Sequence, residues 1–418
     1  MCKTMQGRDS NIKSEARVHA HPVVFLFLVL PFGILGGYVS VAFAYLYSKA
    51  GVSVDAIAAL IATSLVPHIF KFLWAPLVDT TLSLKKWYIL SCIITAAGII
   101  STVFFPVRES SLAPLTLIMV VANTAVSFLG IATNGLAAHD TPEEMKGRVG
   151  GYSQAGNLGG AGLGGGAGLW LAQHLTTGWM PATIIALSCL ACCAGLFFIK
   201  EPPALIRTGK ALETISNLFK DLWVTIKARL GFLALFLCFL PLGTGAASNL
   251  WAAIATDWKA SSDTVALVTG VMGGIVTAAG CLAGGWICDK MNRQRAYMIF
   301  GLMQAACAAG MAYSPRTEIM YIIWTTVYAF TLGFAYAAFS AFVFEAIGKG
   351  AAGTKFTVYA CLSNIPIYYM TLLEGWGHSH YGAKGMLLLE SVAGLAAVLL
   401  FMGLLTVTKK PKAEGVAG

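Results

Sequence analysis

The stretch Ala75-Pro-Leu-Val-Asp79, followed by Lys85, decides how this 418-residue chain should fold, because a similar stretch returns about 210 positions later. There Gly285-Trp-Ile-Cys-Asp289 is followed by Arg295, and Lys85 and Arg295 both stand six places after the aspartate. Each copy leads from one long apolar run into the next. A membrane chain whose halves repeat a helix, a charged loop and a helix is typical of transporters, which hold substrate between the halves.

The composition indicates an integral membrane protein. Hydrophobic residues make up 57% of the chain, charged residues make up 11%, and the mean hydropathy is +0.73. These values exclude an ordinary water-soluble globule. The apolar runs are long enough to cross ~30 Å of hydrocarbon as helices, and they lack the alternation of a membrane barrel. We predict twelve helical spans, at residues 22–48, 54–78, 87–106, 112–138, 149–174, 179–199, 230–256, 264–288, 297–314, 318–344, 355–376 and 383–407.

The basic residues of the loops predict the orientation in the membrane. If the loops are assigned alternately to the two sides, 22 of the 28 basic residues fall on the side that also holds both termini. By the positive-inside rule that side is cytoplasmic. The net charge of +9 therefore reports membrane topology, and we expect no nucleic-acid partner.

The spans should form two pseudo-symmetric six-helix bundles, at residues 1–199 and 229–418, joined by residues 200–228. Within the joint, apolar residues from Leu212 to Ile226 recur at i, i+3 and i+4. This spacing is typical of an amphipathic helix. We predict a surface helix on the cytoplasmic side that ties the bundles together, and a plain linker is the alternative.

Charged residues at the inner ends of several spans are candidates for a gate. Asp79 and Asp289 can accept hydrogen bonds from the N–H groups of a neighbouring helix start and pair with the basic residues that follow. Such contacts would form when the cytoplasmic side closes and break when it opens. The alternative is loop charge that sets topology alone. The predicted gate comprises Asp79, Lys85, Asp140, Arg148, Gly285, Asp289, Arg293, Arg295 and Glu345.

Glycines in the run 149–174 predict close packing with a neighbouring helix. Gly156, Gly160, Gly164 and Gly168 repeat at four-residue steps. In lipid, such a ridge lets two backbones approach closely. We expect this span to pack against a helix of the other half and to slide on it.

Polar residues within the spans are costly in lipid and suggest a cavity for substrate. Neutral hydrogen-bonding and aromatic groups dominate, which suits sugars, peptides or amphiphiles, although each residue could instead bond two helices together. Lys71 could attract a carboxylate or phosphate, or extend its stem to the membrane surface. The candidates are Tyr38, Tyr45, Lys71, Asn123, Ser127, Asn134, Asn249, Trp251, Tyr328, Tyr336, Asn364 and Tyr368.

Three further ionisable residues, His68, Glu374 and Glu390, are candidates for proton coupling. The sequence holds no nucleotide-binding motif, metal-ligand set or catalytic constellation that we recognise, so we expect no cofactor and no enzymatic activity. The predicted partners are a small-molecule substrate, the lipid bilayer and protons, and we expect a monomer. The alternatives are a facilitator or exporter of another small organic solute and, in a different class, a membrane sensor that binds without transporting.

The stretch Phe70-Lys-Phe-Leu-Trp-Ala-Pro-Leu-Val-Asp79 resembles the signature of the muropeptide permease and acetyl-CoA transporter family, within the major facilitator superfamily. Lys146-Gly-Arg148, Leu169-Trp-Leu-Ala172 and Thr354-Lys-Phe356 are similar too, and Gly285 to Lys290 resembles the general loop motif of the superfamily. The resemblance implies a twelve-helix, alternating-access permease of the bacterial inner membrane, often driven by protons. In the muropeptide branch it implies import of cell-wall turnover fragments.

Overall fold

The computed structural model describes residues 20–142, 145–201, 220, 223–347 and 352–408, without the side chains of 79, 80, 146, 147 and 352–354. Within these ranges the chain is helical and contains no strand. Eight of the described helices are long and apolar enough to cross a membrane, or nine if a bent pair counts as one span. The predicted all-helical membrane fold is confirmed. Most of the predicted joint, including its amphipathic helix, lies outside the described residues.

The helices before residue 200 pack mainly against one another, with α1 on α7 and α5 on both α6 and α9. Several predicted spans are built from two or three consecutive helical segments. The segments are α1 (Val23–Gly37), η1 (Tyr38–Phe43), α2 (Ala44–Lys49), α3 (Val54–Ile69), α4 (Lys71–Thr80), α5 (Leu84–Ser101), η2 (Thr102–Phe104), η3 (Glu109–Ser111), α6 (Leu112–Asp140), α7 (Lys146–Ala161), η5 (Gly162–Ala167), α8 (Gly168–His174), α9 (Met180–Ala191) and η6 (Cys192–Phe198).

The helices after residue 228 form a second group, in which α15 packs on α13 and α14, and α14 packs on α17. The long α17 contains residues 364–376 of one predicted span and the whole of the next, 383–407, and the non-helical Gly382 (φ 68°) lies between them. The segments are α11 (Arg229–Leu237), η7 (Ala246–Asn249), η8 (Ala255–Trp258), α12 (Ser262–Val265), η9 (Ala266–Met272), α13 (Gly273–Lys290), α14 (Arg293–Tyr313), α15 (Glu318–Ile347), α16 (Ala352–Leu362) and α17 (Asn364–Val407).

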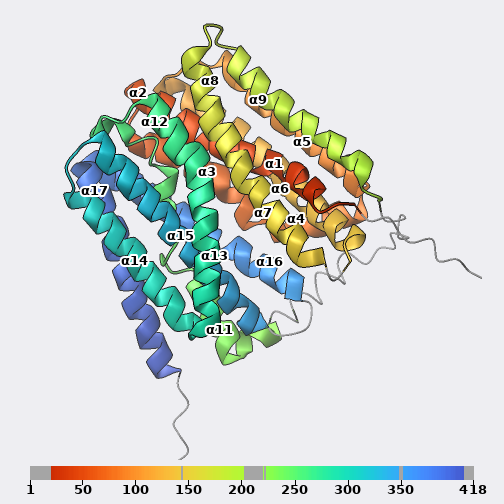
Figure 1. Cartoon of the computed structure of the whole chain (residues 1–418), viewed down its shortest axis with the longest axis vertical. Helices are drawn as coiled ribbons and strands as arrows, with labels where there is room; N and C mark the ends of the chain where they lie inside the picture. The colour runs from red at the N-terminus through yellow and green to blue at the C-terminus, as the bar shows by residue number, and fades with distance from the viewer. Residues whose placement is uncertain (1–19, 143–144, 202–219, 221–222, 348–351, 409–418) are drawn as a thin grey trace, which may run out of the picture.

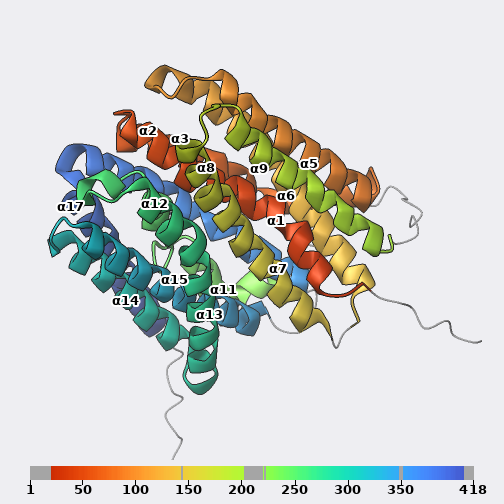
Figure 2. The same ribbon diagram turned by 45° about the horizontal axis from the view of Figure 1, so that its top comes forward.

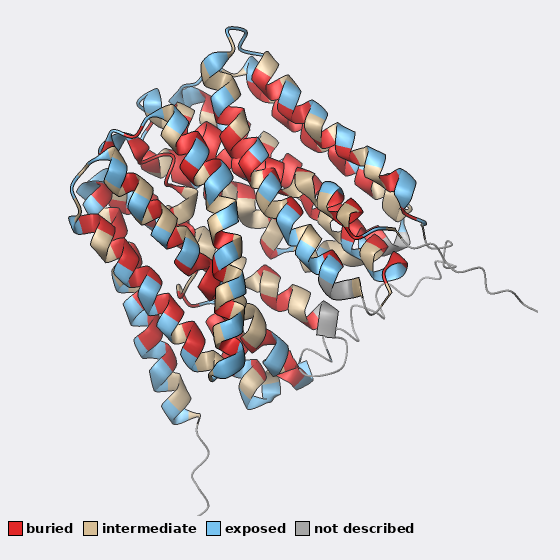
Figure 3. Cartoon of the chain, in the orientation of Figure 1, coloured by how far each residue is buried: buried red, intermediate tan, exposed pale blue. Residues whose placement is uncertain are grey.

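The two groups lie side by side, with the first group drawn from red to yellow-green and the second from green to blue (Figures 1 and 2). We call the end of the bundle that holds Ala20 and Lys290 the proximal end, and the end that holds Lys49 and Glu318 the distal end. Buried residues line the contacts between helices, and exposed residues face outward (Figure 3). Large apolar side chains stand among those outward residues, including Phe104 at 78% and Leu282 at 79% exposure. These faces are suited to lipid.

The predicted continuous helix at residues 230–256 is wrong over most of its length. A regular helix ends at Leu237, and the chain then continues as turns and short 3-10 segments to Ala260. Pro241 has no N–H to donate, and Gly243 (φ 63°) and Gly245 (φ 70°) adopt left-handed conformations that few other residues tolerate. The irregular segment is buried by the surrounding helices, which is the condition for non-helical backbone at membrane depth.

Candidate functional site

The backbones of the two halves come close together where η5 crosses η9. Both segments are π-helical turns within longer helices, a feature that often marks functional positions. A Cβ atom built on Gly270 would lie 2.5 Å from the Cα of Gly166, and one built on Gly162 would lie 3.3 Å from the Cα of Val271. The backbones therefore touch with almost no side chain between them. This confirms that the glycine-rich span packs against the other half, while sliding stays a prediction.

From this crossing the two helices diverge toward the proximal end. Gly274 still faces Leu158, because a Cβ atom at Gly274 would lie 3.0 Å from the Leu158 carbonyl oxygen. Further along, a Cβ atom at Gly150, Gly151 or Gly285 would meet no other atom within 4 Å. Figures 1 and 2 show α7 and α13 separating in the same direction.

At the distal end the halves are joined by polar contacts. The backbone N–H of Asp55 on α3 faces the hydroxyl of Ser379 on α17 at 3.4 Å, and α3 packs along α17. Two further contacts link other helix ends across the halves. They are a hydrogen bond from the Ser48 hydroxyl to the carbonyl of Ala253, and a pair of His174 Nε2 with Asp263 Oδ1 at 4.0 Å. The halves thus meet at the distal end, and α7 and α13 part toward the proximal end, while α4 still contacts α16 of the other half.

The residues predicted as a gate lie at the parted, proximal end. Asp289 is exposed and makes no hydrogen bond or ion pair in the described part of the chain, and Gly285 has open space around it. The side chain of Asp79 lies outside the described residues. Arg293 Nη1 pairs with Glu345 Oε2 at 3.4 Å, which joins α14 to α15 within one half. A latch between the halves is therefore not engaged in this state at Asp289.

The other predicted gate residues make local contacts. Asp140 is buried, and its Oδ2 accepts a hydrogen bond from the backbone N–H of Ala20 at 3.2 Å. Lys85 donates its backbone N–H to Glu201 Oε1 at 3.3 Å. Arg295 donates its backbone N–H to Asn292 Oδ1 at 3.1 Å, which caps the start of α14.

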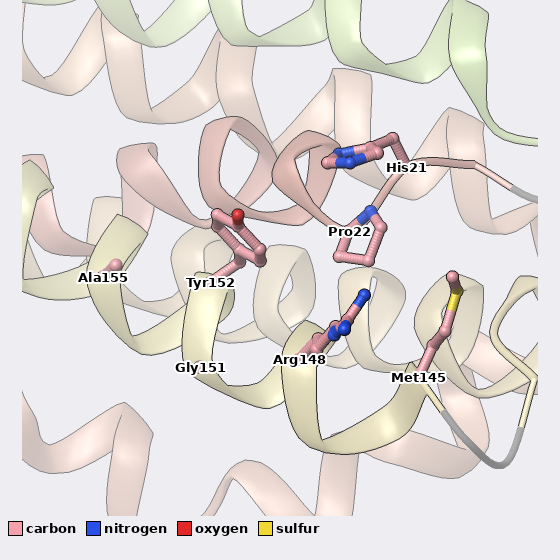
Figure 4. A pocket seen from close by; sticks show the side chains of 7 residues that line it. All are labelled: His21, Pro22, Met145, Arg148, Gly151, Tyr152 and Ala155. Carbon is pink, nitrogen blue, oxygen red and sulfur yellow. The ribbon is translucent and has the colours of Figure 1, made fainter. Parts of the chain in front are cut away.

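Arg148 lines a pocket of about 400 Å³ between the start of α1 and the start of α7. Figure 4 shows its guanidinium directed toward Pro22, with the rings of His21 and Tyr152 above it. The two rings are 6.4 Å apart between centroids. Arg148 is thus brought to the N-terminal end of α1, and neither Asp289 nor Glu345 lines this pocket.

Around Lys71, the structure gathers side chains from α1, α3, α4 and α6 into one cluster. His68 Nε2 lies 3.0 Å from Asn123 Oδ1, and the ring of Phe32 lies 5.2 Å from the His68 ring. The Lys71 ammonium lies 5.3 Å from the centroid of the same Phe32 ring. It also lies 2.7 Å from the position that a Cβ atom on Gly130 would occupy. Three of the sequence-predicted residues, His68, Lys71 and Asn123, therefore share one site.

A second polar cluster forms in the other half, where two predicted acids meet. Glu374 is 0% exposed and lies beside Glu390, which is 6% exposed. Tyr328 donates its hydroxyl hydrogen to Glu390 Oε1 at 2.6 Å. The Tyr328 ring meets the Trp251 indole edge-on at 5.1 Å, so the cluster reaches the irregular segment after α11. Neither oxygen of Glu374 has a hydrogen-bond partner in the described part of the chain.

Other predicted cavity residues are engaged within their own bundle or helix. Asn249 donates to Thr371 Oγ1 at 3.2 Å, and the Tyr38 hydroxyl pairs with Thr102 Oγ1 at 3.1 Å. Ser127 donates its hydroxyl hydrogen to a carbonyl of its own helix, and Asn364 at the start of α17 donates its amide hydrogens to the Ala360 and Cys361 carbonyls at the end of α16. Tyr45 is buried, and the remaining three, Asn134, Tyr336 and Tyr368, are partly or fully exposed.

Sequence reasoning missed Gln304 on α14. It is 1% exposed, and both polar atoms of its amide lack a hydrogen-bond partner among the described residues. A glutamine in the middle of an apolar run is a signal of the same kind as Asn123, and it could have been included on that ground. Phe32 carries no such signal, because phenylalanine is common in membrane helices.

A helical membrane protein whose two halves meet at one end, part at the other and enclose buried polar clusters belongs to the class of membrane transporters. The chain belongs to the Major Facilitator Superfamily, whose family model matches residues 25–371. It is therefore a transporter and not an enzyme.

Two curated relatives support this assignment. The chain is 24% identical over 345 residues to the anhydromuropeptide permease of Escherichia coli K12, a match that covers 80% of this chain and 70% of the relative. The permease of Escherichia coli O157:H7 matches with the same identity and coverage. The resemblance predicted from the sequence is confirmed.

Solved structures share the fold. A variant of the nucleoside transporter NupG has a TM-score of 0.71 at 12% identity, over 91% of this chain and 98% of its own. A D-xylose-proton symporter has a TM-score of 0.69 at 13% identity, over 91% and 95%. The inward-open xylose transporter XylE from E. coli has a TM-score of 0.66 at 11% identity, over 94% and 97%.

Proposed function

We propose that the protein is a secondary transporter that imports a small organic solute, such as a cell-wall muropeptide or a related sugar-peptide, by alternating access. The observation that carries the proposal is the asymmetry of the two ends. The halves are joined at the distal end, and α7 and α13 part at the proximal end beside Asp289, which makes no ion pair with any described residue. The similarity to anhydromuropeptide permeases supports this choice of solute.

We further propose that the termini are cytoplasmic, in a bacterial inner membrane. The concentration of 22 of the 28 basic residues on one side supports this orientation. The proximal end then faces the cytoplasm, and the structure corresponds to an inward-facing state. In the outward-facing state, Asp289 and Asp79 would engage the other half, and the distal contacts would break.

The pair Glu374 and Glu390 supports coupling to protons. Two carboxyl groups side by side in an apolar interior cannot both be ionised, because neither charge is solvated and the two repel each other. No lysine, arginine or histidine among the described residues forms an ion pair with either of them. The pair would therefore hold at least one proton. Loss of that proton would alter the Tyr328 hydrogen bond, which adjoins Trp251 in the irregular segment.

The test is uptake into proteoliposomes that contain the purified protein, with and without an inward proton gradient. The solutes are an anhydro-sugar muropeptide, acetyl-CoA, a neutral disaccharide and a dipeptide. Gradient-stimulated uptake of the muropeptide is the expected result. Uptake of another solute, indifferent to the gradient, would replace the proposal by a facilitator for that solute. Binding without uptake of any solute would indicate a sensor.

A further inference from the structure

The ammonium of Lys71 is a cation without a counter-ion. It forms no hydrogen bond or ion pair with any residue that the structure describes, and its contact is with the face of the Phe32 ring at 5.3 Å. Lys71 is only half-buried, so part of its side chain is accessible from outside the protein. A charge within the span of a membrane protein is costly when unpaired, and such charges usually mark a substrate or ion pathway.

The backbone and the neighbouring helix hold this ammonium in place. The helix axis bends by 49° at Phe70, between Pro67 and Pro76, each of which removes a helical hydrogen-bond donor. Lys71 is the first residue after the bend, and its Nζ lies over Gly130 of α6. A Cβ atom on Gly130 would lie only 2.7 Å from Nζ, so the absent side chain at residue 130 makes the space that the cation occupies.

The polar neighbours of Lys71 that the structure describes include no carboxylate. Asn123 donates its Nδ2 hydrogen to the Met119 carbonyl at 2.9 Å, which leaves its Oδ1 as the acceptor that faces His68 Nε2. Nε2 must therefore carry a hydrogen and donate it to Asn123 Oδ1. This bond satisfies Asn123 Oδ1 and His68 Nε2, whereas His68 Nδ1 is buried without a hydrogen-bond partner among the described residues. Lys71 supplies a positive charge that no described carboxylate balances.

We propose that Lys71, with Phe32 and Gly130, forms an anion subsite that receives a carboxylate of the transported solute. The inference deepens the proposed function, on which it rests, by naming the class of solute: an acidic sugar or sugar-peptide rather than a neutral sugar. A carboxylate at Lys71 forms a charge-assisted hydrogen bond and neutralises the cluster. A lysine also binds phosphate as a point charge, so a phosphate-bearing solute is included in the test.

The experiment measures binding to the full-length protein in detergent. The probes are an anhydro-sugar muropeptide, the same molecule with its carboxylates converted to methyl amides, and acetyl-CoA as a phosphate-bearing probe. The wild-type protein should prefer the carboxylate form by about tenfold to a hundredfold. Lys71→Gln should remove that preference and leave affinity for the amide form unchanged.

Gly130→Ala keeps the charge but places a methyl group 2.7 Å from the ammonium, so Nζ must shift away from α6 and the carboxylate preference should weaken. Gly36→Ala is the matched control, because a Cβ atom at Gly36 would meet nothing within 4 Å. Lys71→Gln should not lower the melting temperature of the ligand-free protein, since it removes an unpaired charge. If Lys71 had a purely structural role, Lys71→Gln would lower the melting temperature and weaken binding of both muropeptide forms equally.

The outcomes separate the subsite from the transport proposal. Equal affinity of the wild-type protein for the acid and its amide would overturn the subsite and leave transport standing. A carboxylate preference that depends on Lys71, without uptake into vesicles, would uphold the subsite and overturn transport. A further outcome is that acetyl-CoA binds more tightly than the muropeptide and loses this advantage in Lys71→Gln. That result would show that the subsite receives a phosphate, and it would overturn the proposal of a carboxylate. Binding of none of these probes would overturn the inference for this solute class.

Discussion

The contact between η5 and η9 gives a direct way to disturb the balance between the two states. In Gly270→Ala, the new Cβ atom would lie 2.5 Å from the Cα and 2.7 Å from the N of Gly166. Carbon atoms in contact normally stand ~3.5–4.0 Å apart, so the two backbones must separate by about 1 Å at the crossing. Overpacking of this kind costs about 1–3 kcal/mol.

The overpacking raises the free energy of the state in which the halves meet at this point, which is the state that the structure describes. If the crossing opens in the other state, Gly270→Ala should shift the equilibrium toward it by about five-fold to 150-fold. Electron–electron distance measurement checks this, with spin labels at residues 179 and 319 in a background whose native cysteines are replaced. Both positions are exposed near the distal end, at 54% for Trp179 and 64% for Ile319.

We expect the variant to populate longer distances between these labels than the parent protein does. Gly36→Ala is the control, because its added methyl group meets nothing within 4 Å. An unchanged distance distribution in Gly270→Ala, with the protein folded and inserted, would refute the view that this crossing holds the distal end closed.

Three other predictions concern the acids and the helix ends. Glu374→Gln and Glu390→Gln should each remove stimulation of uptake by a proton gradient while exchange of solute across the membrane continues; full stimulation in both variants would exclude the pair from coupling. Asp289→Asn should reduce uptake by about tenfold or more with normal membrane insertion, because an engaged latch is lost in the other state; wild-type flux would remove Asp289 from the gate. His174→Ala should change uptake by less than about twofold, because its pair with Asp263 is long and exposed and such pairs contribute little; a tenfold loss would show that this pair holds the distal end.

Much of the fold could be predicted from the sequence, because a helix that must cross the bilayer needs a long apolar run, and such runs are easily recognised. The glycine steps from Gly156 to Gly168 also predicted contact with the other half, since only small residues allow two backbones to touch. The break after Leu237 was missed because the apolar run continues through Pro241, Gly243 and Gly245. Hydropathy reports membrane depth, and it does not report whether the backbone stays helical.

The candidate site could be predicted only in part, because its clusters depend on which helices become neighbours. Glu374 and Glu390 were each suggested by their cost in lipid, but their contact across the Gly382 break in α17 has no local sequence signal. The position of Lys71 over Gly130 likewise depends on the bend at Phe70 and on how α4 packs against α6. The state of the gate could not be predicted from the sequence, because one sequence must support both the inward-facing and the outward-facing state.

The central claim is that this chain moves an acidic sugar-peptide across a membrane, and counterflow tests it most directly. Proteoliposomes are loaded with unlabelled anhydro-sugar muropeptide and diluted into a trace of the labelled compound without any ion gradient. The account predicts a transient accumulation of label, because an alternating-access carrier exchanges solute whether or not it is coupled to protons. Label that never rises above that of protein-free vesicles, with the protein folded and binding the compound, would contradict the account.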